Sequence, residues 1–292
     1  MGEGSGQQAF GQGVQTPEAS EAFEAFEAGD IRGLDVSVAH PARVYDAWLG
    51  GKDHFAPDRA AAEQVLAANP GIRPGVRANR AFLARAVRFL AADCGIRQFL
   101  DLGTGLPSAN NVHEVAQASA PEARVVYVDN DPIVLVHARA LLTGTPGTVD
   151  YVDGDIRDGQ RILTAAARTL DLTRPVAVML VMTLQFVLDE DDPYGLVRRY
   201  LDAVPSGSYL VISHPASDGG EHAAVANQAT ARYNQVVATP MKRRSRAEFD
   251  AFFEGLELVE PGVVPLSQWR PDPDDAAPER QSPAYCAVAR KP

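Results

Sequence analysis

The chain has 292 residues, a length that suits one large α/β domain with an appendage or two small domains, and we favour the first. Its 38 acidic and 27 basic side chains give a formal net charge of −11, which provides no general attraction for nucleic acid or anionic lipid. No apolar run approaches 18 residues, and the first six residues lack the basic and apolar regions of a signal peptide. The composition therefore favours small-molecule chemistry in the cytoplasm, with no nucleic-acid or membrane partner.

Residues 1–34 carry the weakest structural signals. The first 17 residues are rich in Gly and Gln and hold too few large apolar side chains to pack, so they are predicted to form a disordered tail. Phe23 and Phe26 would share one side of a short helix after that tail.

Residues 35–95 are predicted to form an N-terminal helical cap. An apolar stripe at helical spacing is formed by Phe82, Leu83, Val87 and Leu90. Two glycine-containing loops, at 50–54 and 69–75, interrupt the helical pattern. We expect these loops to lie where they could close over a ligand.

From residue 96 to the end, strands alternate with helices, the pattern of an α/β domain with a mostly parallel sheet and helices on both faces. We predict a Rossmann-like sheet of seven strands, of which the last two form an antiparallel hairpin. The strands are placed near 97–102, 124–129, 149–153, 175–182, 208–213, 262–266 and 284–289.

Two helix starts are marked by capping residues. Asp131 precedes Pro132 and is predicted to be an N-cap, while Ser245 and Glu248 form a capping box. The basic run 242–244 just before that box is interpreted as a solvated face rather than a nucleic-acid patch.

The most informative motif is the strand that ends at Asp101 and continues into Gly103 and Gly105. Only glycine permits close backbone approach or a positive φ at low cost, so this loop suits a nucleotide-like ligand. The third glycine of a dinucleotide fingerprint is absent, with Ser108 in its place. A carboxylate beside the loop disfavours pyrophosphate and suits a cationic sulfonium and ammonium, so S-adenosylmethionine (SAM) fits better than NAD.

A second acid supports this interpretation. Asp129 ends the next strand 24 residues after Gly105, the spacing of an acid that accepts hydrogen bonds from ribose hydroxyls.

Methyl transfer depends mainly on positioning and desolvation, and a general base helps only when the acceptor carries a proton of high pKa. The candidate catalytic residues are His54 in a cap loop, Gln185 after the fourth strand and His214 after the fifth. His214, Asp218 and His222 also have a metal-like spacing, but glycines at 219 and 220 interrupt that helix and no strong third ligand is near. No metal site is predicted.

The order of these motifs resembles the class I, Rossmann-like SAM-dependent methyltransferases. More narrowly, the chain is similar to an S-adenosyl methyltransferase family that is abundant in actinobacteria and was formerly a domain of unknown function. The matching stretches are RVYD (43–46), LGGKD (49–53), ANRAFL (78–83), FLDLGTGLP (99–107), NVHEVAQ (111–117) and VYVDNDP (126–132). The resemblance covers residues from about 40 to the end.

The resemblance implies roles for individual residues. The loop from Asp101 to Gly105 would border the methionine part of SAM, and Asp155 with Ile156 would flank adenine. A helix N-cap is the structural alternative for Asp155. The expected cofactor-binding residues are Asp101, Gly103, Thr104, Gly105, Asp129, Asn130, Asp155 and Ile156.

The leading functional prediction is therefore methyl transfer from SAM to a small-molecule acceptor, which the sequence does not identify. A non-catalytic SAM-binding regulator and an NAD-dependent oxidoreductase are the alternatives.

Aromatic, acidic and basic side chains at 45–54 surround a glycine pair, so we expect this segment to act as a lid over the methionine end of SAM. A surface helix end is its alternative. The oligomeric state is not predicted.

Overall fold

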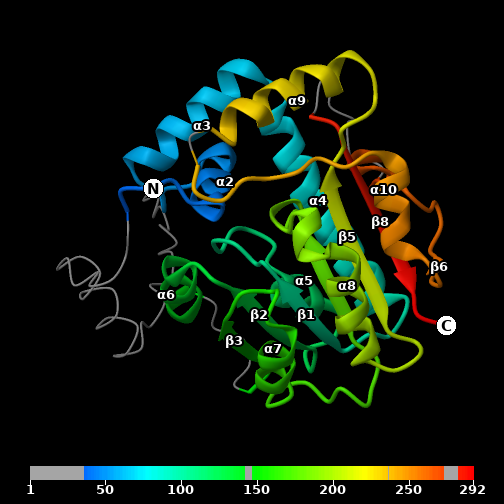
Figure 1. The fold of residues 1–292 in the computed structure, drawn as a ribbon. Helices are drawn as coiled ribbons and strands as arrows, with labels where there is room; N and C mark the ends of the chain where they lie inside the picture. The colour runs from blue at the N-terminus through cyan, green and yellow to red at the C-terminus, as the bar shows by residue number, and fades with distance from the viewer. Residues whose placement is uncertain (1–35, 142–146, 236, 273–281) are drawn as a thin grey trace, which may run out of the picture. The chain divides into compact units, whose positions relative to one another are not determined.

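A computed structural model describes residues 36–141, 147–235, 237–272 and 282–292 (Figure 1). The tail and the short helix predicted within residues 1–34 lie outside this part of the chain. The predicted boundaries between tail, cap and sheet domain stay a prediction.

The centre of the fold is an eight-stranded sheet in the order β3-β2-β1-β4-β5-β8-β6, with β7 paired to β8. The first five strands of that order run parallel, whereas β8 is antiparallel to β5, β6 and β7. The strands are β1 Gln98–Leu102, β2 Arg124–Asp129, β3 Val149–Asp153, β4 Ala177–Val181, β5 Tyr209–Pro215, β6 Glu257–Leu258, β7 Val264–Pro265 and β8 Ala284–Arg290. The predicted fold class and the antiparallel final pair are confirmed, but the predicted count of seven strands is wrong because β6 is only two residues long and carries no strand signal.

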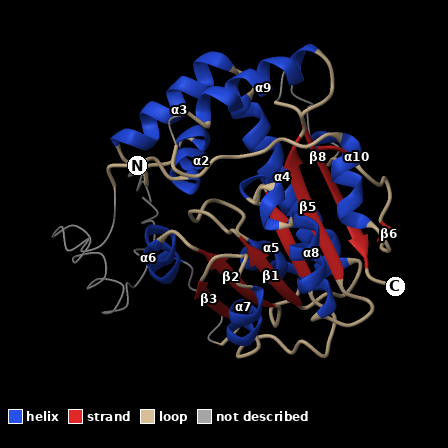
Figure 2. Ribbon diagram, in the orientation of Figure 1, coloured by secondary structure: helices blue, strands red, loops and turns tan. Residues whose placement is uncertain are grey.

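Helices cover both faces of the sheet (Figure 2). The α-helices are α2 Pro41–Leu49, α3 Ala56–Ala68, α4 Ile72–Ala92, α5 Val112–Ser119, α6 Pro132–Leu141, α7 Gly159–Ala166, α8 Pro193–Asp202, α9 Glu221–Tyr233 and α10 Arg246–Asp250. Short 3-10 turns are η1 Leu184–Phe186, η2 Asp189–Asp191, η3 Ala251–Phe253 and η4 Leu266–Gln268. None of the helices in the described ranges has the length and apolar character needed to span a bilayer.

Alternation along the strands builds one core on each face. In β1, Leu100 and Leu102 pack with α7 and α8 on one face, while Phe99 packs with α4 and α5 on the other. Trp269 is fully buried on the second face, edge-on to Phe82. The sheet is therefore buried on both sides, and only its strand ends are free to bind a ligand.

A separate apolar cluster lies above the carboxyl ends of the parallel strands. Val44 of α2 and Val65 of α3 pack there against Tyr233 of α9. Figure 1 shows α9 lying along α3, although the two helices are far apart in the sequence. We use "the cap" below for α2, α3 and α9.

The local capping predictions are confirmed. The Asp131 carboxylate accepts from the backbone N–H of Ile133 at 3.0 Å, and Ser245 forms a capping box with Glu248. The solvated-face interpretation of 242–244 is wrong. Arg244 is fully buried, and Arg243 lines the main pocket.

Candidate cofactor and acceptor site

One pocket lies where the carboxyl ends of β1 to β5 meet the cap. Residues directly after the first four parallel strands line it, as expected for an open α/β sheet. Its far part is lined by side chains of the cap, by Thr239, Met241 and Arg243, and by residues 282–284. A strand-end subsite and a cap-side chamber therefore share one cavity.

The glycine loop after β1 adopts left-handed backbone at both predicted positions. Gly103 has φ 76° and Gly105 has φ 69°. A Cβ on Gly103 would overlap the Thr183 side chain, whereas a Cβ on Gly105 would meet no atom within 4 Å. Gly103 is thus required by packing inside the protein, and Gly105 keeps the pocket side of the loop open.

Asp129 holds that loop in place. Its Oδ2 accepts the N–H of Gly105 at 2.8 Å, and its Oδ1 accepts the N–H of Asp131 at 2.9 Å. Burial raises the pKa of Asp129, and these two backbone donors act in the opposite direction. Each carboxylate oxygen can accept a second hydrogen bond, so two adjacent ribose hydroxyls fit this side chain. Asn130 lines the pocket beside it.

Asp101 and Arg80 line the next part of the pocket. Burial raises the pKa of Asp101 to about 7, the Arg80 charge lowers it, and Asp129 raises it further. Arg80 donates to the carbonyls of Ala109 and Asn110, each at 3.1 Å, while its Nε is buried without a hydrogen bond in the described structure. A buried acid and an unsatisfied guanidinium nitrogen fit the ammonium and carboxylate of a methionine moiety. Sequence reasoning missed Arg80, although it lies in the quoted stretch 78–83.

Asp155 and Ile156 also line the pocket, after β3. Asp155 accepts from the backbone N–H of Arg157 at 2.9 Å and pairs with its guanidinium at 2.8 Å. The N-cap of α7 is Asp158, so the structural alternative for Asp155 is wrong. The eight expected cofactor-binding residues therefore come together around one cavity, with Thr104 in the glycine loop among them.

The segment after β4 lines the pocket between β4 and the cap. Met182 has φ 55°, an uncommon value for a residue with a side chain, and its N–H donates to the carbonyl and the hydroxyl of Ser213. Gln185 donates to the Met182 carbonyl at 2.7 Å, whereas its Oε1 is buried without a partner in the described structure. Gln185 lines the pocket, as its predicted role requires. Nothing in the sequence signals the unusual backbone of Met182.

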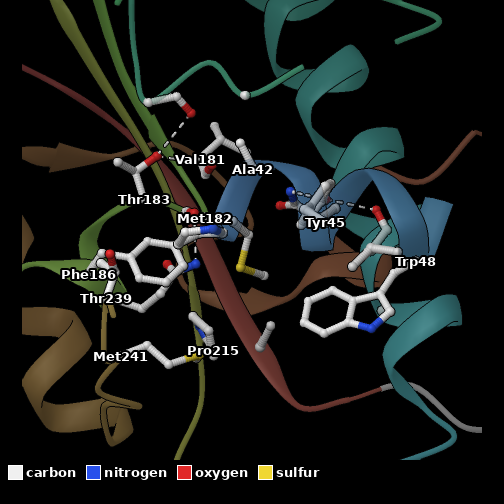
Figure 3. A pocket seen from close by; sticks show the side chains of 18 of the residues that line it. Ala42, Tyr45, Trp48, Val181, Met182, Thr183, Phe186, Pro215, Thr239 and Met241 are labelled. Atoms are coloured by element: carbon white, nitrogen blue, oxygen red, sulfur yellow. Dashed lines mark hydrogen bonds between the residues drawn. The ribbon is translucent and has the colours of Figure 1, made fainter. Parts of the chain in front are cut away.

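The cap closes the pocket on the side opposite the strand ends. Figure 3 shows Tyr45 and Trp48 of α2 facing Met182 and Phe186 across the cavity, with Met241 beside them. Tyr45 accepts from Asn79 at 2.9 Å, and Asn79 accepts from Ser213 at 2.6 Å, so a hydrogen-bonded chain links the cap through α4 to β5.

The two candidate histidines lie outside the pocket lining. His54 Nδ1 is 2.9 Å from an Asp46 carboxylate oxygen that also accepts the N–H of Asp53, so His54 belongs to the α2–α3 loop. His214 is fully buried between the Pro215 carbonyl and the Arg244 guanidinium, at 2.9 Å and 2.8 Å. Burial, with the Arg244 charge, lowers the pKa of His214 to about 3.

Both ring nitrogens of His214 are therefore occupied, and we propose no catalytic role for it. Asp218, its partner in the metal-like spacing, instead accepts from the Tyr285 hydroxyl and the N–H of Arg246.

Comparison with known proteins agrees with this geometry. The profile of the S-adenosyl methyltransferase family matches residues 27–292. A DUF574 family protein from Streptomyces avermitilis is 48% identical, with 88% of this chain and 99% of that chain aligned at a TM-score of 0.84. A structure from Thermobifida fusca described as a candidate methyltransferase is 42% identical, with 89% and 97% aligned at a TM-score of 0.81. No curated protein matches the chain.

The family match covers most of the chain, including the glycine loop, the acid after β2 and the cap-side chamber. The chain therefore belongs to the S-adenosyl methyltransferase family and is a SAM-dependent methyltransferase.

Proposed function

We propose that this methyltransferase modifies a small molecule bound in the cap-side chamber. The observation that carries the proposal is the continuity of the pocket from Asp129 at the sheet to Trp48 in the cap. Concave, mostly apolar cavities with a few polar groups are typical of small-molecule sites. A macromolecular acceptor would instead require the reacting group to reach past the cap.

We assign the strand ends to the cofactor. Asp129 would accept from the ribose hydroxyls, Ile156 would face adenine, and Asp101 with Arg80 would bind the methionine end. When bound, SAM supplies a methyl group on a positive sulfonium, and the electron pair of the broken C–S bond stays on sulfur.

The residues of this chain then act by placement. Met182 and Phe186 exclude water near the reacting atoms, and Gln185 can orient a polar acceptor group through its unpaired Oε1. We assign no general base, since neither His54 nor His214 reaches the pocket. A proton on the acceptor atom would leave to solvent. The cytoplasmic location stays a prediction.

The proposal can be tested by following a labelled methyl group. The full chain is incubated with SAM carrying a CD3 group and an extract of Streptomyces avermitilis separated into low-mass, protein and nucleic-acid fractions. We expect a mass increase of a trideuterated methyl group only in the low-mass fraction. Trp48→Ala should reduce this transfer while S-adenosylhomocysteine (SAH) still binds. Label confined to protein or nucleic acid would reject a small-molecule acceptor.

A further inference from the structure

The basic run Lys242, Arg243 and Arg244 alternates between two environments. Lys242 lies 2.6 Å from Asp189 and 2.8 Å from Glu248, and Arg244 lies 3.3 Å from Asp189. Arg243 lines the pocket instead. The two outer cations are thus neutralised by acids, and the middle one is directed to the cavity.

Arg243 is held only by neutral groups. Its Nε and Nη2 donate to the Ala216 carbonyl at 2.9 Å and 2.6 Å, and Nη2 also donates to the Pro283 carbonyl at 2.9 Å. No described carboxylate forms an ion pair with it, and its Nη1 makes no hydrogen bond to a described residue. Burial lowers the pKa of Arg243 to about 10, so the side chain remains a cation at neutral pH.

Arg243 is half-buried, and a cation partly removed from water without a counter-charge is less stable than a paired one. The two carbonyl oxygens accept three hydrogen bonds from the Arg243 guanidinium, but neither oxygen carries a full negative charge. The remaining nitrogen, Nη1, carries two N–H donors that match a carboxylate oxygen.

The charges of the pocket are divided along the sheet. The acids Asp101, Asp129 and Asp155 follow β1, β2 and β3. Arg243 is bound to carbonyls beside the paired ends of β5 and β8. The intervening strands place it roughly 10 to 15 Å from the glycine loop, at about 4.8 Å per strand. Two other pocket-lining bases in the described ranges have carboxylate partners, since Arg157 pairs with Asp155 and His40 pairs with Asp131. Arg80 is bound to the carbonyls of Ala109 and Asn110, after the glycine loop, and its charge acts on Asp101 at the cofactor end.

We propose that the methyl acceptor is an organic anion, with an apolar body in the cap-side chamber and a carboxylate bound by Arg243. This inference rests on the proposed small-molecule function and specifies its substrate class. The carboxylate is the recognition group at the β5–β8 end, and the methyl group goes to a different atom nearer the cofactor.

Paired probes that differ only in charge test the proposal. The full chain saturated with SAH is titrated calorimetrically with a series from phenylacetate to 5-phenylpentanoate and with the corresponding amides. At least one carboxylate should bind about tenfold more tightly than its amide. Arg243→Gln should abolish that preference, and Arg243→Lys should keep part of it. Arg246→Gln is the matched control, because Arg246 is exposed and pairs with Asp250.

The outcomes separate this inference from the proposed function. SAH affinity and melting temperature are measured on every variant, which shows that each one is folded and binds the cofactor product. The inference is overturned if no carboxylate in the series binds more tightly than its amide, or if Arg243→Gln retains the preference. The small-molecule function itself fails only if the CD3 label enters macromolecules.

Discussion

Three residues at the strand ends, Asp129, Gly103 and Gly105, support the proposed SAM site. Asp129 holds the glycine loop by its Gly105 hydrogen bond, so the residue to which we assign the ribose contact also shapes the neighbouring subsite. Gly103 packs against Thr183, and Gly105 leaves space. The first glycine of the G-x-G motif thus serves internal packing, and we assign cofactor access to the second.

Alanine substitutions should separate these two glycine roles. Gly103→Ala should lower the free energy of unfolding by more than the roughly 1–2 kcal/mol cost of left-handed backbone, and Thr183→Ala should restore part of the loss. Gly105→Ala should cost only the backbone strain and should weaken SAH binding, with no rescue by Thr183→Ala. Urea unfolding and calorimetry on the double-mutant cycle measure both effects. Rescue of both glycine variants by Thr183→Ala would contradict the distinction.

Asp129→Ala should weaken SAH binding by roughly 1–3 kcal/mol through the lost ribose contact, and by more if the glycine loop moves. The loop contribution is expected because two backbone N–H groups lose their acceptor. Asp153→Ala is a control, since Asp153 ends the neighbouring strand and does not line the pocket. If calorimetry finds that folded Asp129→Ala protein binds SAH as tightly as the wild type, the assignment of Asp129 to the ribose is wrong.

The raised pKa of Asp101 predicts a pH dependence. The pKa of Asp101 is about 4 in the unfolded chain and about 7 in the folded protein. Between these two pH values, the folded protein binds one more proton at Asp101 than the unfolded chain. This group therefore lowers the free energy of unfolding as pH rises across that window, and Asp101→Asn should remove the decline. SAM affinity should increase through pH 7 as the carboxylate ionises beside a cationic ligand. Binding that is insensitive to pH from 6 to 8 in the wild type would argue against the Asp101 role.

At the scale of elements, Arg244 joins the segment before α10 to η1 and β5. It donates to the Leu184 carbonyl at 3.0 Å, to the Val187 carbonyl at 2.8 Å and to His214. This arrangement holds the turn after β4 through two of its backbone carbonyls. It also occupies Nε2 of His214, at the end of β5, which is why we assign that histidine no catalytic role.

Arg244→Leu should therefore destabilise the fold by about 3–5 kcal/mol, because it strands buried acceptors. Arg246→Leu is the matched control, since its exposed pair with Asp250 contributes about 0–1 kcal/mol. Chemical denaturation of both variants gives the comparison. A loss below 1 kcal/mol for Arg244→Leu would show that the buried network is not stabilising.

How far the sequence predicts this architecture depends on how local each signal is. Periodicity and capping residues are local, which is why the five parallel strands, Asp131 and the Ser245 capping box are predicted correctly. The direction of Arg243 is not predictable, because irregular backbone has no period that assigns a face. His214 looks like a free strand-end base until Arg244, thirty residues later, is placed against it.

For the whole molecule, the packing of α9 on α3 is the feature that completes the ligand site. A helix that follows β5 closes a chamber begun by the N-terminal helices, so residues from distant segments line one cavity. The Asp46 carboxylate holds the α2–α3 loop. Gly50 ends α2 with a left-handed φ of 85°, so this glycine has a role in helix capping in addition to the lid role that we predict for the segment.

Hydrogen exchange with and without SAH tests the central claim, that the cofactor binds at the strand ends of a pocket closed by the cap. Exchange should slow at 101–106 and 129–131, and also across 44–56, which spans the end of α2 and the α2–α3 loop, because ordering on binding protects backbone amides. Protection of the sheet loops alone would make the cap a structural element and contradict its role as a lid. Protection at neither strand end would contradict the assigned cofactor site itself.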